Sequence, residues 1–231
     1  MMDFYLGFDR YFILLVIPPL ILSLWAQFKV KSTFNKYSRI RSKNGVTGAQ
    51  AAQFLLKNND IHNVGIMSVA GSLTDHYDPG KRELRLSQPV YGQASIAAIG
   101  VAAHEAGHAI QHARAYGPLG LRSTLVPVAQ ISSGIGPYLI IGGMAIPSLP
   151  MLLDIGIILF VGAVIFYLIT LPVEFNASSR ALANLSNSNI LSADELRGAK
   201  KVLSAAAMTY VASALSAVLT LIRLLLIRRR R

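Results

Sequence analysis

The sequence contains no cysteine and few acidic residues. Without cysteine there is no disulfide framework and no thiolate ligand, so any metal ion must be held by histidines and carboxylates. Only 11 residues are Asp or Glu, against 22 Lys or Arg, and charged residues make up 14% of the 231 residues. An ordinary soluble domain has about 25%. This deficit, together with 53% hydrophobic residues, indicates a membrane protein.

Four apolar stretches account for the low charge. Each is near or above the roughly 18–20 residues that span a bilayer, and they cover residues 11–28, 125–146, 151–171 and 202–227. The first stretch is not typical of a signal peptide, because Asp3 and Asp9 precede it and Pro18-Pro19 interrupts it. No small-residue cleavage site follows it either. We therefore predict a retained anchor.

The excess of basic residues matches a membrane surface better than a nucleic acid. Basic residues between Lys29 and Lys43 follow the first stretch, and Arg228 to Arg231 follow the last. Such flanks are typical of cytoplasmic loops and of contact with anionic headgroups. Nucleic-acid-binding surfaces often carry aromatic residues, on which bases stack, between their basic residues, and the basic segments of this chain lack that pattern. We therefore expect the lipid bilayer and no nucleic acid as a partner.

The charge-poor middle of the chain predicts its topology. No Lys or Arg occurs between Ser123 and Ser179, and the two apolar stretches there are joined by Pro147-Ser148-Leu149-Pro150. We interpret this joint as a tight turn on one side of the bilayer. The basic segments before and after the interval then lie together on the other side, which the positive-inside rule makes cytoplasmic.

His104-Glu105-Ala106-Gly107-His108 is the most informative motif. Two histidines four apart on a helix lie on one face, about 6 Å apart along its axis, so both imidazoles can reach one zinc ion. Glu105 lies on the neighbouring flank, where it can take a proton from a metal-bound water. The surrounding residues, 95–113, are rich in Ala and contain no Pro, which favours a helix.

A catalytic zinc usually takes three protein ligands, so one more is needed. His112 lies one helical turn, about 6 Å, beyond His108, and we interpret it as a neighbour of the site. Asp154 opens the third apolar stretch, about 30 Å of helix away from Glu174. Glu174 lies where that stretch ends on the basic side, and we predict it as the third ligand; the alternative is a solvated interfacial carboxylate. Asp194 and Glu195 are typical first-turn acids of a helix.

The polar region also carries secondary-structure signals. Thr47 is a typical N-cap for a helix through Leu56. Residues 64–69 predict a strand, and residues 73–77 and 82–86 predict a hairpin with Pro79-Gly80 at its turn. The fold expected is a mainly α integral membrane protein with a small α+β zincin-like portion. Its segments are an N-terminal transmembrane anchor at 1–28, a cytoplasmic zincin-like portion with the motif helix at 29–121, a transmembrane hairpin at 122–173, a third-ligand segment and helix at 174–201, and a C-terminal apolar helix with a basic tail at 202–231.

Four motifs together resemble a known family. They are His104 to Gln111, Asp75 to Pro79, Pro172 to Phe175 and Thr209 to Ala212. They look like the bacterial membrane-bound neutral zinc metallopeptidases of the YugP type, distantly similar to the HtpX-type membrane peptidases. The resemblance implies a multi-pass protein of the bacterial plasma (inner) membrane and one zinc ion held by two His and a Glu.

One position departs from the relatives' pattern. In the HtpX-type peptidases an Asp four residues after the ligand Glu buttresses a histidine, whereas this chain has Ser178 there. Asn176 and Asp75 are the possible substitutes.

The sequence therefore predicts a membrane-bound zinc metalloendopeptidase, with a protein or peptide substrate. His104, His108 and Glu174 would hold Zn²⁺, and Glu105 would act as general base. An edge strand of the hairpin would hold the substrate. His76 or Tyr77 would stabilise the oxyanion, although turn chemistry and strand packing explain these two residues equally well.

Two other functions compete with this one. A site-2-type intramembrane zinc protease would use Asp154, within Leu153-Asp154-Ile155-Gly156, as its third ligand. A membrane scaffold would have a structural metal or none.

The last apolar stretch raises a further alternative. A straight crossing would export Arg228 to Arg231, against the positive-inside preference. We therefore predict a helix that starts beside the zinc site and enters the bilayer only partly; the alternative is a fourth spanning helix.

Overall fold

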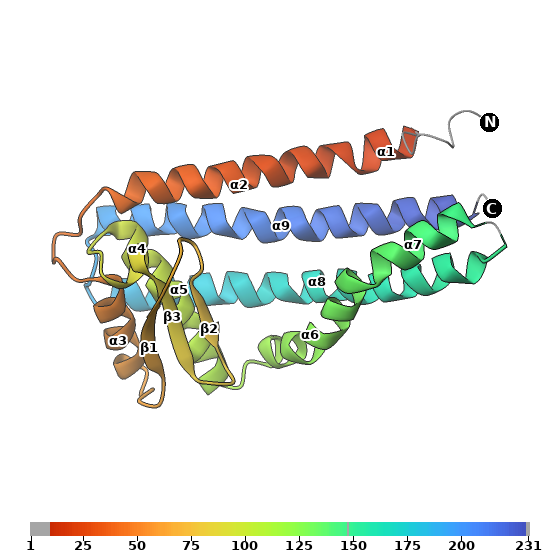
Figure 1. Ribbon diagram of the computed structural model, residues 1–231. Coiled ribbons are helices and arrows are strands. Elements are labelled where there is room, and N and C mark those ends of the chain that lie inside the picture. The colour runs from red at the N-terminus through yellow and green to blue at the C-terminus, as the bar shows by residue number, and fades with distance from the viewer. Residues whose placement is uncertain (1–9, 147, 230–231) are drawn as a thin grey trace. The chain divides into compact units, whose positions relative to one another are not determined.

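The computed structural model describes residues 10–146 and 148–229 (Figure 1). Five residues named in the predictions, Asp3, Asp9, Pro147, Arg230 and Arg231, lie outside the described residues. The chain divides into two compact units. We call residues 1–26, 120–172 and 209–231 the helical unit, and residues 27–119 and 173–208 the mixed unit.

A three-stranded sheet with the order β1-β3-β2 lies in the mixed unit. The strands are β1 (Gly65–Val69), β2 (His76–Asp78) and β3 (Glu83–Ser87). The predicted hairpin is confirmed, since β2 pairs antiparallel with β3 and Tyr77 lies opposite Leu84. β1 pairs with β3 in parallel, a pairing that the sequence pattern did not predict. β2 is therefore an edge strand.

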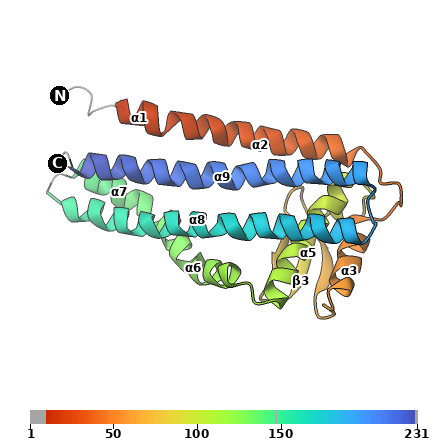
Figure 2. The same ribbon diagram turned by 180° about the vertical axis from the view of Figure 1, so that it is seen from behind.

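Helices cover one face of this sheet. They are α3 (Gly48–Asn58), the short α4 (Gln88–Tyr91) and α5 (Ile96–Ala113), the last of which carries the motif. Views from opposite sides show α5 behind the strands in Figure 1 and in front of them in Figure 2. Leu84 and Leu86 of β3 are fully buried in one core with Leu55 of α3 and Ile99 of α5. The sheet therefore holds the motif helix through apolar packing.

The start of α3 is capped as the sequence predicts. The Gln50 N–H donates to the Thr47 hydroxyl oxygen at 3.3 Å, and the Thr47 N–H donates to the Gln50 side-chain oxygen at 2.9 Å. These reciprocal bonds form a capping box, which satisfies two backbone donors that the first turn of a helix leaves unpaired.

Three long helices contribute residues to both units. They are α2 (Ile17–Ser38), α8 (Pro150–Asn187) and α9 (Ala193–Arg229). The sequence analysis placed a segment boundary after residue 173, but α8 continues through Pro172 without a break. Proline removes its own N–H donor and crowds the carbonyl four residues earlier, and membrane helices tolerate both effects. Glu174 therefore lies within a helix, where its direction is set by the helical repeat.

Within residues 10–146 and 148–229, four helical stretches are long and apolar enough to cross a membrane. They are Tyr11–Ser38, Gly117–Ala145, Pro150–Asn187 and Ala193–Arg229. The first covers all of α1 (Arg10–Leu15) except its first residue, together with α2, and the second contains α6 (Gly117–Gly134) and α7 (Gly136–Ala145). The chain is thus a mainly α membrane protein with a small α+β part, as predicted.

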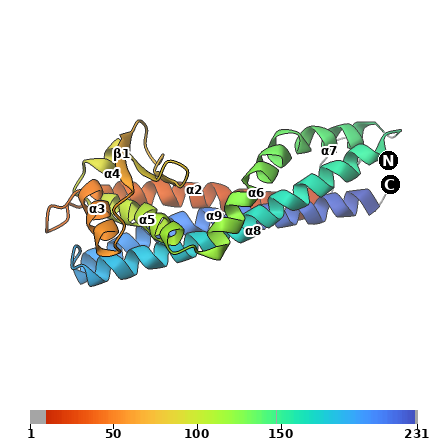
Figure 3. The same ribbon diagram turned by 90° about the horizontal axis from the view of Figure 1, so that it is seen from below.

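Close helix contacts in the helical unit occur at glycines. A Cβ on Gly143 of α7 would lie 2.2 Å from the Leu153 nitrogen of α8, so only glycine allows this approach. Figure 3 shows α7 beside the first turns of α8. On α9, Leu224 packs with Leu153 and Ile157 of α8 in a small buried cluster.

An ion pair lies at the end of α9. The Arg228 Nε donates to Asp154 Oδ1 at 2.7 Å, so the last turn of α9 lies beside the first turns of α8. Partial entry of this helix into the bilayer stays a prediction, and Ala193–Arg229 is long and apolar enough to cross a membrane.

Candidate metal centre

The motif helix α5 begins at an N-cap serine and is almost wholly buried. The Ser95 hydroxyl oxygen accepts from the Ala98 N–H at 3.2 Å, which fixes the first turn. From this start the helical repeat places His104 and His108 on one face. In the mixed unit that face packs against residues 173–178 of α8.

Gly107 lets the two helices approach closely. A Cβ at this position would lie 2.5 Å from the carbonyl oxygen of Ala177 and 3.2 Å from its carbonyl carbon. Both are backbone atoms, which cannot move aside as a flexible side chain can. The glycine of the motif therefore sets the spacing at which α8 presents Glu174 to the two histidines.

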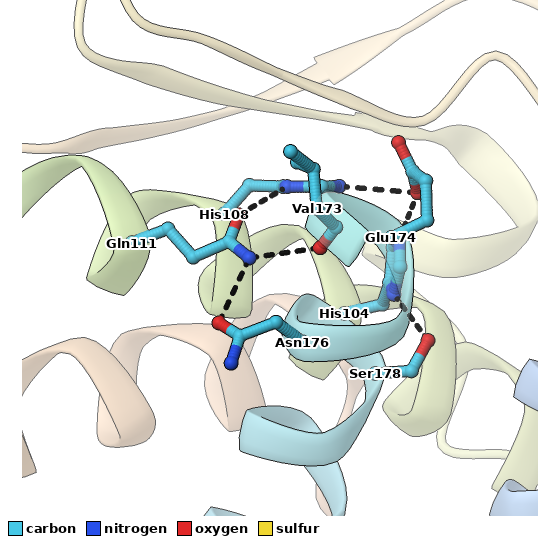
Figure 4. A network of polar contacts seen from close by, with 7 residues as sticks. All are labelled: His104, His108, Gln111, Val173, Glu174, Asn176 and Ser178. Atoms are coloured by element: carbon cyan, nitrogen blue, oxygen red, sulfur yellow. Dashed lines mark hydrogen bonds and ion pairs between the residues drawn. The ribbon is translucent and has the colours of Figure 1, made fainter. Parts of the chain in front are cut away.

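His104, His108 and Glu174 form a cluster whose ligand atoms all lie within 4.8 Å of one another. Glu174 Oε2 lies 3.2 Å from His104 Nε2 and 3.5 Å from His108 Nε2 (Figure 4). In a tetrahedral zinc site with bonds of about 2.0–2.1 Å, neighbouring ligand atoms lie about 3.3 Å apart. The donor set and its spacing therefore fit a zinc ion.

The site is buried and negatively charged. Glu174 is 2% exposed, His108 and Glu105 are each 7% exposed, and His104 is half-buried. Burial by itself lowers the pKa of His108. Hydrogen bonding to Glu174 and the charge of Glu105 outweigh it, so this pKa lies above its ordinary value. Two carboxylates that favour a protonated imidazole also favour a bound cation.

The second nitrogen of each histidine has a polar partner. His104 Nδ1 lies 3.1 Å from Ser178 Oγ, and His108 Nδ1 lies 3.0 Å from Gln111 Oε1. Gln111 Nε2 in turn donates to the Val173 carbonyl oxygen at 2.8 Å and to Asn176 Oδ1 at 3.0 Å (Figure 4).

These contacts revise the expected support of the histidines. The serine itself contacts His104, and Asn176 reaches His108 only through Gln111. Asp75, the other expected substitute, instead accepts from the Ser87 N–H at 2.7 Å. The sequence analysis missed Gln111, although its position three residues after His108 puts both on one helical face.

The two residues predicted near the oxyanion lie on β2. Tyr77 OH lies 2.8 Å from Nδ1 of His112, so this bond ties the edge strand to the motif helix. His76 is exposed, and its Nδ1 lies 2.9 Å from the Thr74 carbonyl oxygen. His112 is thus a neighbour of Tyr77, one turn beyond His108.

Two other acidic residues that follow the motif, Asp154 and Glu195, have partners of their own. Asp154 pairs with Arg228. Glu195 Oε2 accepts from the Ser192 N–H at 2.8 Å at the start of α9, which is the first-turn role that the sequence predicts. Its Oε1 also accepts from the Lys43 N–H at 2.7 Å.

The fold and the cluster together define a class of protein: a membrane protein with two helical histidines and a carboxylate arranged for a metal ion. The chain belongs to the family described as "putative neutral zinc metallopeptidase", whose model matches residues 12–229. It is 52% identical, over 216 residues, to the "putative membrane protease YugP" of Bacillus subtilis (strain 168). That match covers 94% of this chain and 96% of the relative. No solved structure matches the chain significantly.

Proposed function

We propose that this protein is a zinc-dependent endopeptidase that hydrolyses peptide bonds, with one Zn²⁺ per chain held by His104, His108 and Glu174. One observation carries the proposal: a buried carboxylate oxygen lies 3.2 and 3.5 Å from two imidazole nitrogens, close to the spacing of neighbouring zinc ligands, and all three atoms lie within 4.8 Å of one another. Membership of a zinc peptidase family supports the choice of metal and of reaction.

A Zn²⁺ ion held by His104, His108 and Glu174 would polarise the scissile carbonyl and lower the pKa of a bound water. Glu105 would accept a proton from the attacking water and return it to the leaving amine. Its position next to His104 on α5, its burial and its effect on the pKa of His108 support this role. A neutral amide at residue 105 would bind no proton and would leave the metal ligands in place.

The substrate would bind as an extra strand on β2. β3 pairs with only one side of β2, which leaves the other side for an extended peptide. Asp75 fixes the beginning of β2 through Ser87, and the Tyr77–His112 bond fixes its middle to α5. These two anchors would hold the strand at a constant distance from the motif helix.

Tyr77 would stabilise the oxyanion. When His112 Nδ1–H donates to the Tyr77 oxygen, the phenol hydrogen is left to donate to the substrate. Burial raises the pKa of Tyr77, so the phenol keeps that hydrogen at neutral pH. His76, exposed at the same edge, would contact the substrate rather than the reacting carbonyl.

We further propose the plasma membrane as the location, with the active site facing the cytoplasm and the basic residues 29–43 near anionic headgroups. The site-2-type alternative would need Asp154 as a ligand. The ion pair of Asp154 with Arg228 favours Glu174 instead.

The test is casein cleavage by protein purified in detergent, with zinc measured on the same samples. We expect Glu105→Gln to keep its zinc and lose about 10²–10⁴-fold in hydrolysis, the range for a lost general base. His104→Ala should lose both zinc and activity, whereas His62→Ala, which removes an exposed histidine outside the cluster, should lose neither. Equal casein cleavage by Glu105→Gln and the parent would refute the proposed peptidase function and favour a non-enzymatic membrane scaffold.

A further inference from the structure

We propose that Gln111, held by Asn176 and Arg180, is a positioning residue that fixes the tautomer of His108. In this tautomer Nδ1 carries the hydrogen and Nε2 offers its lone pair to the metal. The inference rests on the proposed zinc site. The proposal adds a chain of hydrogen bonds around Gln111. At each outer end of this chain lies a group that can only donate or only accept, so the donor and acceptor of every bond in the chain are fixed.

The first fixed end is a backbone carbonyl. The Val173 oxygen can only accept, and it lies 2.8 Å from Gln111 Nε2. The two ends of an amide are assigned from their partners, and this partner requires the NH₂ group. The opposite end of the same amide, Oε1, therefore faces His108.

The second fixed end is a cation. The Arg180 guanidinium can only donate, and its Nε lies 2.7 Å from Asn176 Oδ1. That oxygen also accepts from Gln111 Nε2 at 3.0 Å. Arg180 thus holds the Asn176 amide so that its oxygen faces Gln111, which again requires the NH₂ group of Gln111 on this side. The Val173 carbonyl and the Arg180–Asn176 pair therefore each require the same orientation of the Gln111 amide.

The orientation of Gln111 decides the state of the neutral His108 ring. Gln111 Oε1 accepts but cannot donate, so the 3.0 Å contact needs a hydrogen on His108 Nδ1. A neutral imidazole has one such hydrogen, which leaves Nε2 as the ligand atom. Gln111 is 0% exposed, so water does not compete for these bonds. Glu174 Oε2, 3.5 Å from Nε2, is the acceptor on the other side of the ring, and the shorter contact with Gln111 favours the hydrogen on Nδ1.

His104 differs in this respect. Its Nδ1 partner is the Ser178 hydroxyl, at 3.1 Å, and a hydroxyl can either donate or accept. Ser178 therefore accommodates both tautomers of His104 and selects neither. The two histidines of the motif thus differ in how their tautomers are determined. The protein fixes the tautomer of His108, whereas the bound metal would select that of His104.

The test compares two substitutions of nearly equal size at residue 176. In Asn176→Asp the carboxylate still accepts from Arg180 and Gln111, so zinc affinity should stay within about threefold of the parent. In Asn176→Leu the acceptor is gone, and affinity should fall about 10–100-fold, the range for lost outer contacts of a metal ligand. Affinity is measured by chelator competition, without substrate, on the full chain in detergent. An equal loss in both variants, or parent-like binding by Asn176→Leu, would overturn the proposal.

A second measurement does not depend on a substitution at residue 176. The ¹⁵N shifts of the histidines of the metal-free parent, followed as the pH is raised until the His108 ring loses its charge, report which nitrogen carries hydrogen. The signal lost in His108→Gln identifies the ring. We expect hydrogen on Nδ1, whereas hydrogen on Nε2 or a mixture of both forms would overturn the proposal even if Asn176→Leu fails to fold. A parent that binds no zinc would instead refute the proposed function, and the tautomer would still be measured.

Discussion

Gly107→Ala should separate the two helices that carry the cluster. The added Cβ would lie 2.5 Å from the Ala177 oxygen, and real Cβ contacts stay beyond 3.0 Å, so the backbones must move apart by at least 0.5 Å. Zinc bond lengths tolerate about 0.2 Å. Glu174 lies on α8 and both histidines lie on α5, so the movement strains the metal site directly.

Gly107→Ala should lower both the stability of the protein and its affinity for zinc. Overpacking of this kind costs about 1–3 kcal/mol of stability. Zinc affinity should fall at least about tenfold, which corresponds to about 1.4 kcal/mol. The assay is chelator competition for zinc, combined with the thermal midpoint of the metal-free protein in the same detergent.

Gly100→Ala is the matched control on the same helix. A Cβ at Gly100 would lie 3.4 Å from the Ala199 Cβ, an ordinary contact, and alanine favours a helix by about 1 kcal/mol over glycine. This variant should bind zinc like the parent and melt at the same temperature or higher. Parent-like zinc affinity in Gly107→Ala would refute the reasoning that this glycine sets the helix spacing.

Two further predictions concern β2. Tyr77→Phe should keep its zinc and lower the turnover of casein about 10²-fold, the cost of one oxyanion donor, and unchanged turnover would remove Tyr77 from the mechanism. Burial raises the pKa of Asp75 above its ordinary value of 3.8, against the lowering effect of the Ser87 hydrogen bonds. The cost of ionising this carboxyl is therefore absent below 3.8 and grows as the pH rises through the raised pKa. Asp75→Asn should accordingly raise the thermal midpoint more at pH 7 than at pH 4. A larger increase at pH 4 than at pH 7 would contradict a raised pKa of Asp75.

Local features of the sequence predict local structure well. The spacing of His104 and His108 places them on one face because that is a property of any α-helix. The Thr47 cap and the strands of the hairpin also depend on near neighbours in the chain, and the structure confirms them. The ligand set remains a prediction, although its three members meet in the structure.

Contacts between distant residues are what the sequence analysis missed. The parallel pairing of β1 with β3 and the Arg228–Asp154 ion pair depend on how separate segments fold together. The predicted boundary between residues 173 and 174 lies inside α8, which continues through Pro172. Gln111 was visible at helical spacing from His108. Its contacts with Val173 and Asn176, more than 60 residues away, depend on how α5 and α8 pack.

The zinc content of Glu174→Ala, compared with that of Asp154→Ala, tests the ligand set most directly. Both substitutions remove one carboxylate from the same helix, α8, and elemental analysis of the detergent-purified proteins gives zinc per chain. We predict that Glu174→Ala loses most of its zinc after brief dialysis against a weak chelator, whereas Asp154→Ala keeps it as the parent does. Full zinc in Glu174→Ala, with loss in Asp154→Ala, would contradict the proposed centre and support the site-2-type alternative.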